Sequence, residues 1–286
     1  MSVDVLQEKI RKCKSPLMLS LQPELAYVPE KYAPRERGIQ AYSDYCEELL
    51  PQLQDCICGV MVSYGAFAVY GQEGLEALNR VQACARGLGY YVLCDLAAGY
   101  TGALSMAWGE EVLKHRDFDA MALCAYAGSD AVKPLLPFTK EGKLLLVHVK
   151  TPNKSAVEIQ DLICGGRLVY SAVAELASRC GQGPVGRFGY TQVGCVMSAN
   201  APRSIETVRG KYRELFLLVS GLDETGGNAK NAALAFDRLG HGAAVCAGGD
   251  ILGAWQMPDA PQDALRAAVD SANRLKKNIL RYVTIL

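Results

Sequence analysis

The residues best suited to chemistry in this chain are polar side chains that directly follow short apolar runs. His148 and Lys150 stand two positions apart, so both would point to the same side of a strand. A lysine in such a position can form a Schiff base or act as an acid. Asp95 ends another apolar run and could join them. These residue types are compatible with acid–base or covalent catalysis.

Two glycine pairs, Gly226-Gly227 and Gly248-Gly249, follow the last two apolar runs. Glycine lets the backbone come close to a ligand, and backbone N–H groups in such loops often bind phosphate. Glycine is also common in tight turns that bind nothing. The pairs therefore predict a phosphate or other anion site, or else simple turns, and both interpretations stay open.

The elements that would position these residues are eight short apolar runs alternating with helix-period segments. The runs are Leu17–Leu21, Ile57–Val62, Tyr90–Asp95, Asp119–Ala125, Leu144–Val149, Val193–Ser198, Leu215–Ser220 and Ala243–Ala247. The helical segments are Ile39–Leu53, Gly74–Leu88, Leu104–His115, Val157–Arg179, Ser204–Tyr212, Ala229–Leu239 and Ala264–Leu280. This alternation predicts an α/β fold, one (β/α)8 TIM barrel domain over residues 1–286, whose ligands meet the C-terminal strand ends.

Composition narrows the class of protein. The chain has 286 residues, half of them hydrophobic, and a formal net charge of zero, without a basic stripe for nucleic acid. No apolar stretch reaches the length of a membrane span or a signal peptide, which predicts a cytoplasmic protein. Eleven cysteines without a Cys-x-x-Cys pair predict reduced thiols, and no cofactor or metal is expected.

Five segments resemble, in order and spacing, motifs of the orotidine 5′-phosphate decarboxylase family, most of all its long bacterial form. They are "LEALNRVQACARGLGYYVLCD" (75–95) with Gly99 and Gly102, "AYAGSDAVKPLLPF" (125–138), "VKTPN" (149–153) with Gln160, "APRSIETVRG" (201–210) and "SGLDETGGNAKN" (220–231). Because the match spans nearly the whole chain, the resemblance implies the same barrel, with a homodimer through its mouth region.

The resemblance also implies a mechanism whose charged residues this chain mostly lacks. In the family, two aspartates and two lysines alternate beside the scissile carboxylate, and one lysine protonates the resulting C6 carbanion. Against the signature D-x-K-R-G-D-I-G, Asp95 is retained, Ala97 stands at the catalytic lysine, and Tyr100 at the second aspartate. The other lysine falls near Met61, and the ribose-binding aspartate appears as Gln22. Without a proton donor the family's reaction is expected to be impaired.

Substrate-binding positions are altered as well. Thr151 and Asn153 of the T-S-N motif remain, but its serine is Pro152. The phosphate-spanning glutamine becomes Thr225, and the phosphate arginine falls at or beside Gly249.

Three functions stay open after this comparison. The first is a binding or regulatory barrel whose ligand is a nucleotide or a sugar phosphate. The second is an enzyme with different chemistry through His148, Lys150 and Asp95, although Lys150 also matches the arginine of V-R-T-S-N. The third is an authentic decarboxylase, in which case the alignment of this sequence with the family's motifs is wrong. Asp95 itself could be functional or a relict.

Overall fold

The strands form a closed, parallel barrel, which confirms the predicted (β/α)8 fold. The structure is a computed structural model that describes residues 1–32, 38–222 and 226–286. Neighbouring strands follow the order β1-β10-β9-β8-β5-β4-β3-β2 around the barrel. Their bounds are Leu17–Leu21 (β1), Gly59–Ser63 (β2), Tyr91–Asp95 (β3), Ala120–Cys124 (β4), Leu144–His148 (β5), Val193–Ser198 (β8), Leu217–Ser220 (β9) and Ala243–Ala247 (β10).

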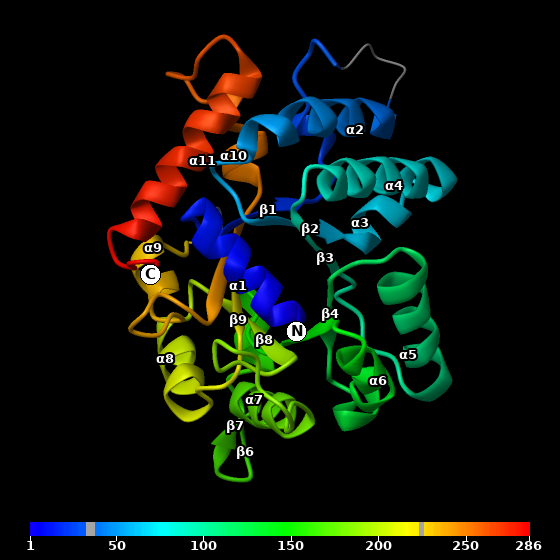
Figure 1. Ribbon diagram of the computed structural model, residues 1–286, viewed down its shortest axis with the longest axis vertical. Coiled ribbons are helices and arrows are strands. Elements are labelled where there is room, and N and C mark those ends of the chain that lie inside the picture. Colours follow the sequence, from blue (N-terminus) through cyan, green and yellow to red (C-terminus); the bar gives the residue numbers. More distant parts are fainter. Residues whose placement is uncertain (33–37, 223–225) are drawn as a thin grey trace.

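Helices surround this barrel (Figure 1). Their bounds are Ser2–Cys13 (α1), Gly38–Leu49 (α2), Tyr64–Ala68 (α3), Gly71–Gly87 (α4), Gly102–Gly109 (α5), Leu136–Lys140 (α6), Val169–Cys180 (α7), Pro202–Lys211 (α8), Ala229–Ala233 (α9), Gly249–Leu252 (α10) and Ala264–Leu280 (α11). A π-helix, Glu110–His115, continues α5. Across the described parts of the chain, every helix is too short or too polar to cross a bilayer.

Two predicted helices are shorter than expected. The segment predicted as a helix over Val157–Arg179 becomes helical only at Val169, because Gly165 and Gly166 both adopt positive φ and turn the chain between strands β6 (Ile163–Cys164) and β7 (Arg167–Leu168). This hairpin projects from the barrel in Figure 1. The helix predicted over Ala229–Leu239 ends at Ala233.

Strand side chains alternate between an outer layer under the helices and an inner layer along the barrel axis. The inner layer includes Met18, Met61, Tyr91, Leu93, Ala120, Ala122, Leu144, Leu146, Val196, Phe216, Leu218, Ala244 and Cys246. Helix α1 contributes Val3, Leu6 and Ile10 to the same buried cluster. It lies across the barrel in Figure 1 and closes the end at which the strands begin.

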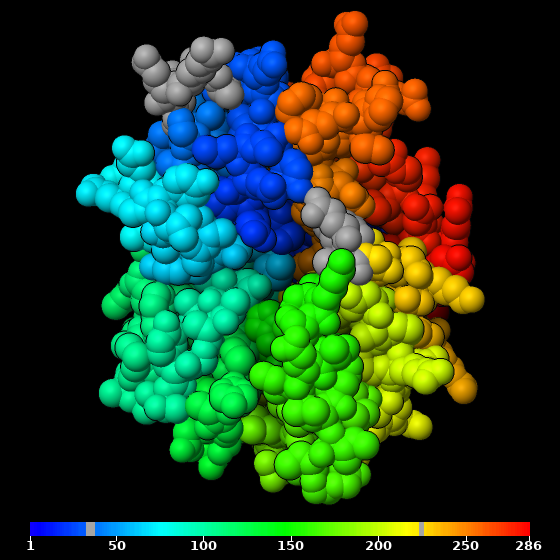
Figure 2. All heavy atoms as spheres, turned by 180° about the vertical axis from the view of Figure 1, so that it is seen from behind, coloured from blue at the N-terminus to red at the C-terminus, as the bar shows by residue number. Residues whose placement is uncertain are grey.

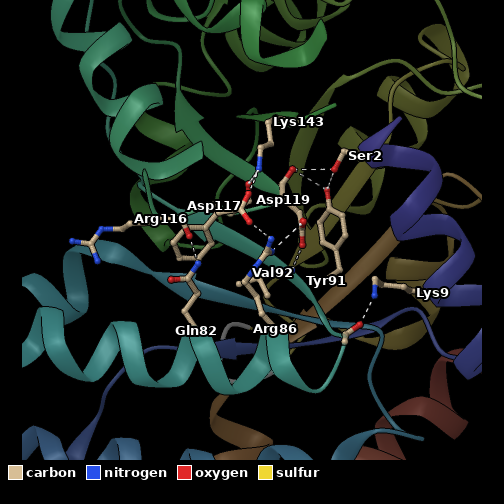
Figure 3. A network of polar contacts seen from close by, with 12 residues as sticks. Ser2, Lys9, Gln82, Arg86, Tyr91, Val92, Arg116, Asp117, Asp119 and Lys143 are labelled. Atoms are coloured by element: carbon tan, nitrogen blue, oxygen red, sulfur yellow. Dashed lines mark hydrogen bonds and ion pairs between the residues drawn. The ribbon is translucent and has the colours of Figure 1, made fainter. Parts of the chain in front are cut away.

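A network of polar contacts links α1 with the β3–β4 region at this closed end (Figure 3). The Asp119 carboxylate accepts a hydrogen bond from the backbone N–H of Val92 at 2.8 Å and one from Arg86 at 3.3 Å. The hydroxyl groups of Ser2 and Tyr91 lie 2.7 Å apart. Because these polar groups satisfy one another, the closed end serves stability and leaves the opposite end for ligands.

Asp237, in the loop between α9 and β10, makes fold stability depend on pH. Burial alone would raise the pKa of its carboxyl, but hydrogen bonds from the backbone N–H of His241, the Tyr190 hydroxyl and the backbone N–H of Leu239 lower it below its usual value. These donors lie 2.8, 2.7 and 2.8 Å from the carboxylate oxygens. A lowered folded-state pKa gives stability that is present above the unfolded pKa of about 3.9 and is lost as the pH falls through the folded value.

Asp237→Asn is therefore expected to lower the free energy of unfolding at neutral pH by about 1–2 kcal/mol. The variant should also lose less further stability than the wild type as the pH falls below about 4. Urea unfolding at several pH values measures both effects. Parallel pH curves for the two proteins would contradict this role of the carboxylate.

Candidate functional site

The open end of the barrel carries a ring of inward-facing polar residues. Strand register and alternation place one such residue at or near the end of each of seven strands. They are Ser20, Ser63, Asp95, Cys124, His148, Ser198 and Ser220. Residues at this end of a (β/α)8 barrel are the ones that bind and transform ligands.

Asp95 and His148 meet within this ring. The Nε2 atom of His148 lies 2.9 Å from the Oδ1 atom of Asp95, although the two residues end strands that are separated by β4. Their side chains are only 15% and 16% exposed. The same carboxylate oxygen accepts the backbone N–H of Ala97 at 3.0 Å. The carboxylate is thus held from two sides and pairs with an imidazole.

Ala97 has an unusual backbone conformation. Its φ is +50°, in the left-handed region that residues other than glycine rarely adopt. The hydrogen bond from its backbone N–H to Asp95 stabilises the turn that brings it there. Its side chain brings only a methyl group to the position that the resemblance gives to the catalytic lysine.

Lys150 does not join His148, contrary to the spacing argument. Its Nζ atom lies 2.6 Å from the Oδ1 atom of Asp161 and 6.0 Å from the centre of the Tyr170 ring. Strand β5 ends at His148, so the two-residue alternation that would place both side chains together does not extend to Lys150. Lys150 is 5% exposed, and its ammonium group is committed to this ion pair.

The other two altered family positions carry no charge either. Met61 lies in the inner layer, and its sulfur is 3.9 Å from the sulfur of Cys246. Tyr100 stacks on Trp108 with ring centres 5.9 Å apart, and Trp108 also packs edge-on against Tyr64 at 5.2 Å. An aromatic cluster therefore surrounds Tyr100, the position that the resemblance gives to the second aspartate.

Four of the six predicted ligand-binding residues line two cavities, Gly248 and Gly249 the first and Thr151 and Asn153 the second, whereas Gly226 and Gly227 belong to neither described lining. A cavity of about 220 Å³ is lined by Ser20, Gln22, Glu24, Tyr27, Met61, Ser220, Gly221, Cys246, Ala247, Gly248, Gly249 and Leu252. A second, of about 550 Å³, is lined by Lys150, Thr151, Asn153, Lys154, Ala156, Val157, Asp161, Leu168, Tyr170, Asn200, Ala201, Pro202, Arg203 and Ser204. The first has one charged side chain in its described lining, Glu24, whereas the second has three cations and one carboxylate.

Packing explains two of the four predicted anion-binding glycines, and backbone conformation explains a third. A Cβ atom would lie 2.9 Å from the Ser20 carbonyl oxygen at Gly248, and 1.9 Å from the Gly221 carbonyl oxygen at Gly227. Gly226 has a φ of +84°, which a turn requires. Gly249 begins helix α10. Asp223, Glu224 and Thr225, beside the first glycine pair, lie outside the described residues.

Thr151 and Asn153 belong to a loop whose residues form hydrogen bonds with one another. The backbone N–H of Thr151 donates to the side-chain oxygen of Gln160 at 3.0 Å, and the Gln160 amide donates to the Thr151 hydroxyl at 2.7 Å. That hydroxyl donates to Asn153 at 2.6 Å, and Asn200 donates to the Pro152 carbonyl oxygen at 2.8 Å. These contacts fix the loop beside the larger cavity.

Sequence reasoning missed Asp161, Cys124 and Ser198. The alternation of side chains within a strand could have indicated Cys124 and Ser198, since both share the inward-facing parity. Nothing in the sequence marks Asp161 as the partner of Lys150. Within the described residues, which include all eleven cysteines, no disulfide forms, and burial raises the pKa of Cys195 to about 12, which makes that thiol unreactive.

Several known proteins to which this chain is similar are orotidine 5′-phosphate decarboxylases. No protein-family model matches. The orotidine 5′-phosphate decarboxylase of Clostridium acetobutylicum is 26% identical over 289 residues, which cover 98% of this chain and all of that relative. The OMP decarboxylase structure of Leishmania donovani aligns with a TM-score of 0.74 and 25% identity, over 96% of this chain and 99% of that one.

The structure of the Plasmodium berghei orotidine 5′-monophosphate decarboxylase shares the fold, with a TM-score of 0.76 at 14% identity, over 98% of this chain and 99% of that one. The resemblance drawn from five sequence motifs is therefore confirmed over nearly the full length of the chain.

Proposed function

We propose that this chain, which resembles the orotidine 5′-phosphate decarboxylases throughout its length, binds a nucleotide or a sugar phosphate and is impaired in decarboxylation. One observation carries the proposal. Asp95 is paired with His148 at 2.9 Å, and the adjacent position, where the resemblance puts the proton-donating lysine, is Ala97. A methyl group can neither carry charge nor donate a proton.

Other lysines are badly placed to take over that role. The sequence contains no lysine between Lys31 and Lys114, a span that includes all of β2 and β3. Lys150 comes from a nearby strand but forms its ion pair with Asp161. The family's electrostatic catalysis needs preorganised charges where charge develops, and these positions hold Ala97, Met61 and Tyr100 instead.

The larger cavity supports binding of an anionic ligand. A volume of about 550 Å³ lies within the range of small-molecule sites. Its lining combines the cations of Lys154 and Arg203 with apolar and amide side chains, while the charge of Lys150 is balanced by Asp161. At the smaller cavity, the backbone at Gly248 and Gly249 could approach a phosphate closely.

A homodimer through the mouth region and a cytoplasmic location complete the proposal. Three large hydrophobic side chains follow the ends of β2, β3 and β4 and are exposed, namely Val69 (78%), Leu104 (52%) and Tyr126 (84%). A second copy could cover this surface. The eleven free thiols fit a reducing compartment.

Thermal unfolding with uridine monophosphate, orotidine 5′-phosphate and ribose 5-phosphate tests the binding proposal. A ligand at 100 times its Kd should add about 2.7 kcal/mol to the free energy of unfolding. Arg203→Gln is expected to reduce this stabilisation, whereas Arg266→Gln, an exposed control on α11, should not. If no nucleotide or sugar phosphate shifts the unfolding midpoint, the ligand class is wrong.

A further inference from the structure

The pair of His148 and Asp95 has the geometry of a proton-transfer device. A carboxylate can only accept a hydrogen bond, so the 2.9 Å contact makes Nε2 of His148 the donor to Asp95. In the neutral ring, Nδ1 is then the nitrogen that can take up a proton. Asp95 fixes this tautomer and stabilises the imidazolium that forms, as the carboxylate does in a catalytic triad.

We infer that His148, positioned by Asp95, removes and returns a proton on a carbon atom next to a carbonyl group of a ligand bound at the mouth. The inference rests on the proposed ligand binding and adds a reaction to it, at the ring of strand-end residues, because neither His148 nor Asp95 belongs to the described lining of the two cavities. Asp95 is a positioning residue here, because it acts through the imidazole.

The neighbours of the pair limit which proton can be moved. Ser63 is the register partner of Asp95 on β2, and Ser198 is two residues beyond the β8 partner of His148. Cys124, on the strand between, is the register partner of His148. Ser63 thus brings a hydroxyl donor beside the pair, whereas the Ser198 hydroxyl already donates to the Asn200 side-chain oxygen at 2.7 Å and Lys150 is held by Asp161.

This arrangement favours an anion whose charge can rest on oxygen. Hydroxyl groups can donate hydrogen bonds to an enolate oxygen, which is how an oxyanion is stabilised without a cation. A localised carbanion would find no such support. A hydrogen atom on carbon beside a carbonyl group meets this condition, since the charge left by its removal moves to the carbonyl oxygen.

In the proposed step the C–H bond breaks and its hydrogen leaves as a proton to Nδ1 of His148. The electron pair of that bond forms a carbon–carbon double bond, and the carbonyl π electrons move to the oxygen, giving an enediolate. Return of the proton to the carbon it left restores the carbonyl group and the neutral imidazole. No oxidant or second substrate is needed. The ligand class is a small hydroxy-carbonyl compound, such as a ketose or a ketose phosphate.

Solvent exchange in D2O tests this step without requiring the natural ligand. The probes are dihydroxyacetone, ribulose and their monophosphates, and proton NMR follows the loss of the hydrogen next to the carbonyl. We expect exchange above the buffer rate with at least one probe. His148→Gln should lower it by about 10²–10⁴-fold, whereas His115→Gln, an exposed control on the π-helix, should leave it unchanged.

The positioning role of Asp95 is tested by a measurement that would stay unchanged if the residue were purely structural. Asp95→Asn should slow exchange and alter the nitrogen NMR signals of the His148 ring, because the acceptor that fixes its tautomer is weakened. Asp95→Glu should recover part of the exchange rate. The unfolding midpoints of all variants verify that they fold.

Each other outcome rejects the inference. Exchange that persists unchanged in His148→Gln would exclude this imidazole as the base. Thermal stabilisation by a probe without exchange would exclude the reaction while leaving the proposed binding site intact. The absence of exchange with every probe would reject the hydroxy-carbonyl class, whatever nucleotides do in the separate binding test.

Discussion

Release of CO2 from orotidine 5′-phosphate is expected to be at least about 10⁴-fold slower with this protein than with an ordinary decarboxylase. Loss of a positioned proton donor costs about 10²–10⁴ in rate, and loss of a preorganised stabilising group costs a further 10²–10³. The resemblance puts Ala97 and Met61 at the two lysine positions and Tyr100 at the second aspartate. The remaining carboxylate of Asp95 is bound to His148 and to the Ala97 backbone.

The measurement compares labelled CO2 release by this protein and by the Clostridium acetobutylicum relative under the same conditions. Binding of orotidine 5′-phosphate, measured separately by thermal unfolding, distinguishes a failure of chemistry from a failure of binding. A rate within tenfold of the relative's would show that the motif alignment is wrong and that another group donates the proton. His148 would then be the first candidate, and His148→Gln would identify it.

The strands were predictable because a parallel strand buried on both faces has a continuous apolar sequence. The runs Leu17–Leu21, Val193–Ser198 and Ala243–Ala247 coincide with β1, β8 and β10. The alternation of strands and helices then specifies a barrel with few alternatives. Resemblance to a known family was not needed for this part of the prediction.

The helices were less predictable where glycine or polar loop contacts decide the backbone. The apolar residues Leu162 and Ile163 have helical spacing with Ile159, yet they lie on an exposed segment that Gly165 and Gly166 turn into a hairpin. Their exposed fractions of 54% and 76% show that the pattern does not report burial. Periodicity predicts a helix only where one face is covered.

The positions of the candidate site residues could be predicted from the sequence, but their hydrogen-bond and ion-pair partners could not. A barrel requires its ligand-facing residues at the C-terminal ends of strands, and this rule identified Asp95, His148 and Lys150. The sequence does not reveal that β5 ends at His148, so it could not separate Lys150 from the mouth. Nor does it reveal that Asp161, eleven residues beyond Lys150, supplies the opposing charge. Such partners depend on loop geometry.

Replacement of Arg209 by methionine is expected to cause a large loss of stability. The guanidinium of this α8 residue donates hydrogen bonds to the carbonyl oxygens of Ala235 at 2.7 Å, Leu215 at 2.8 Å, Gly242 at 2.8 Å and Arg213 at 3.1 Å. Burial lowers the pKa of Arg209 from its ordinary value. Each buried group left unsatisfied costs about 1–3 kcal/mol, so Arg209→Met should lose about 3 kcal/mol or more.

Urea unfolding measures this loss, and two further variants interpret it. Arg209→Lys keeps the charge but cannot reproduce the planar fork of donors, so its loss should be intermediate. Arg266→Met removes an exposed arginine that is 3.9 Å from Asp270 within α11, and should cost less than about 1 kcal/mol. A loss below about 1 kcal/mol in Arg209→Met would mean that water replaces the guanidinium at these carbonyl groups.

The position of Arg209 bears on how the resemblance itself is understood. This arginine belongs to the segment "APRSIETVRG", one of the five that resemble the decarboxylases, yet its donors bind backbone carbonyl groups between α8 and β10 and contact no residue of the mouth. A motif that supports the barrel could therefore persist whether or not the catalytic charges do. If Arg209→Met destabilises the protein as expected and CO2 release is as slow as expected, the similarity in sequence will have reflected the scaffold rather than the reaction.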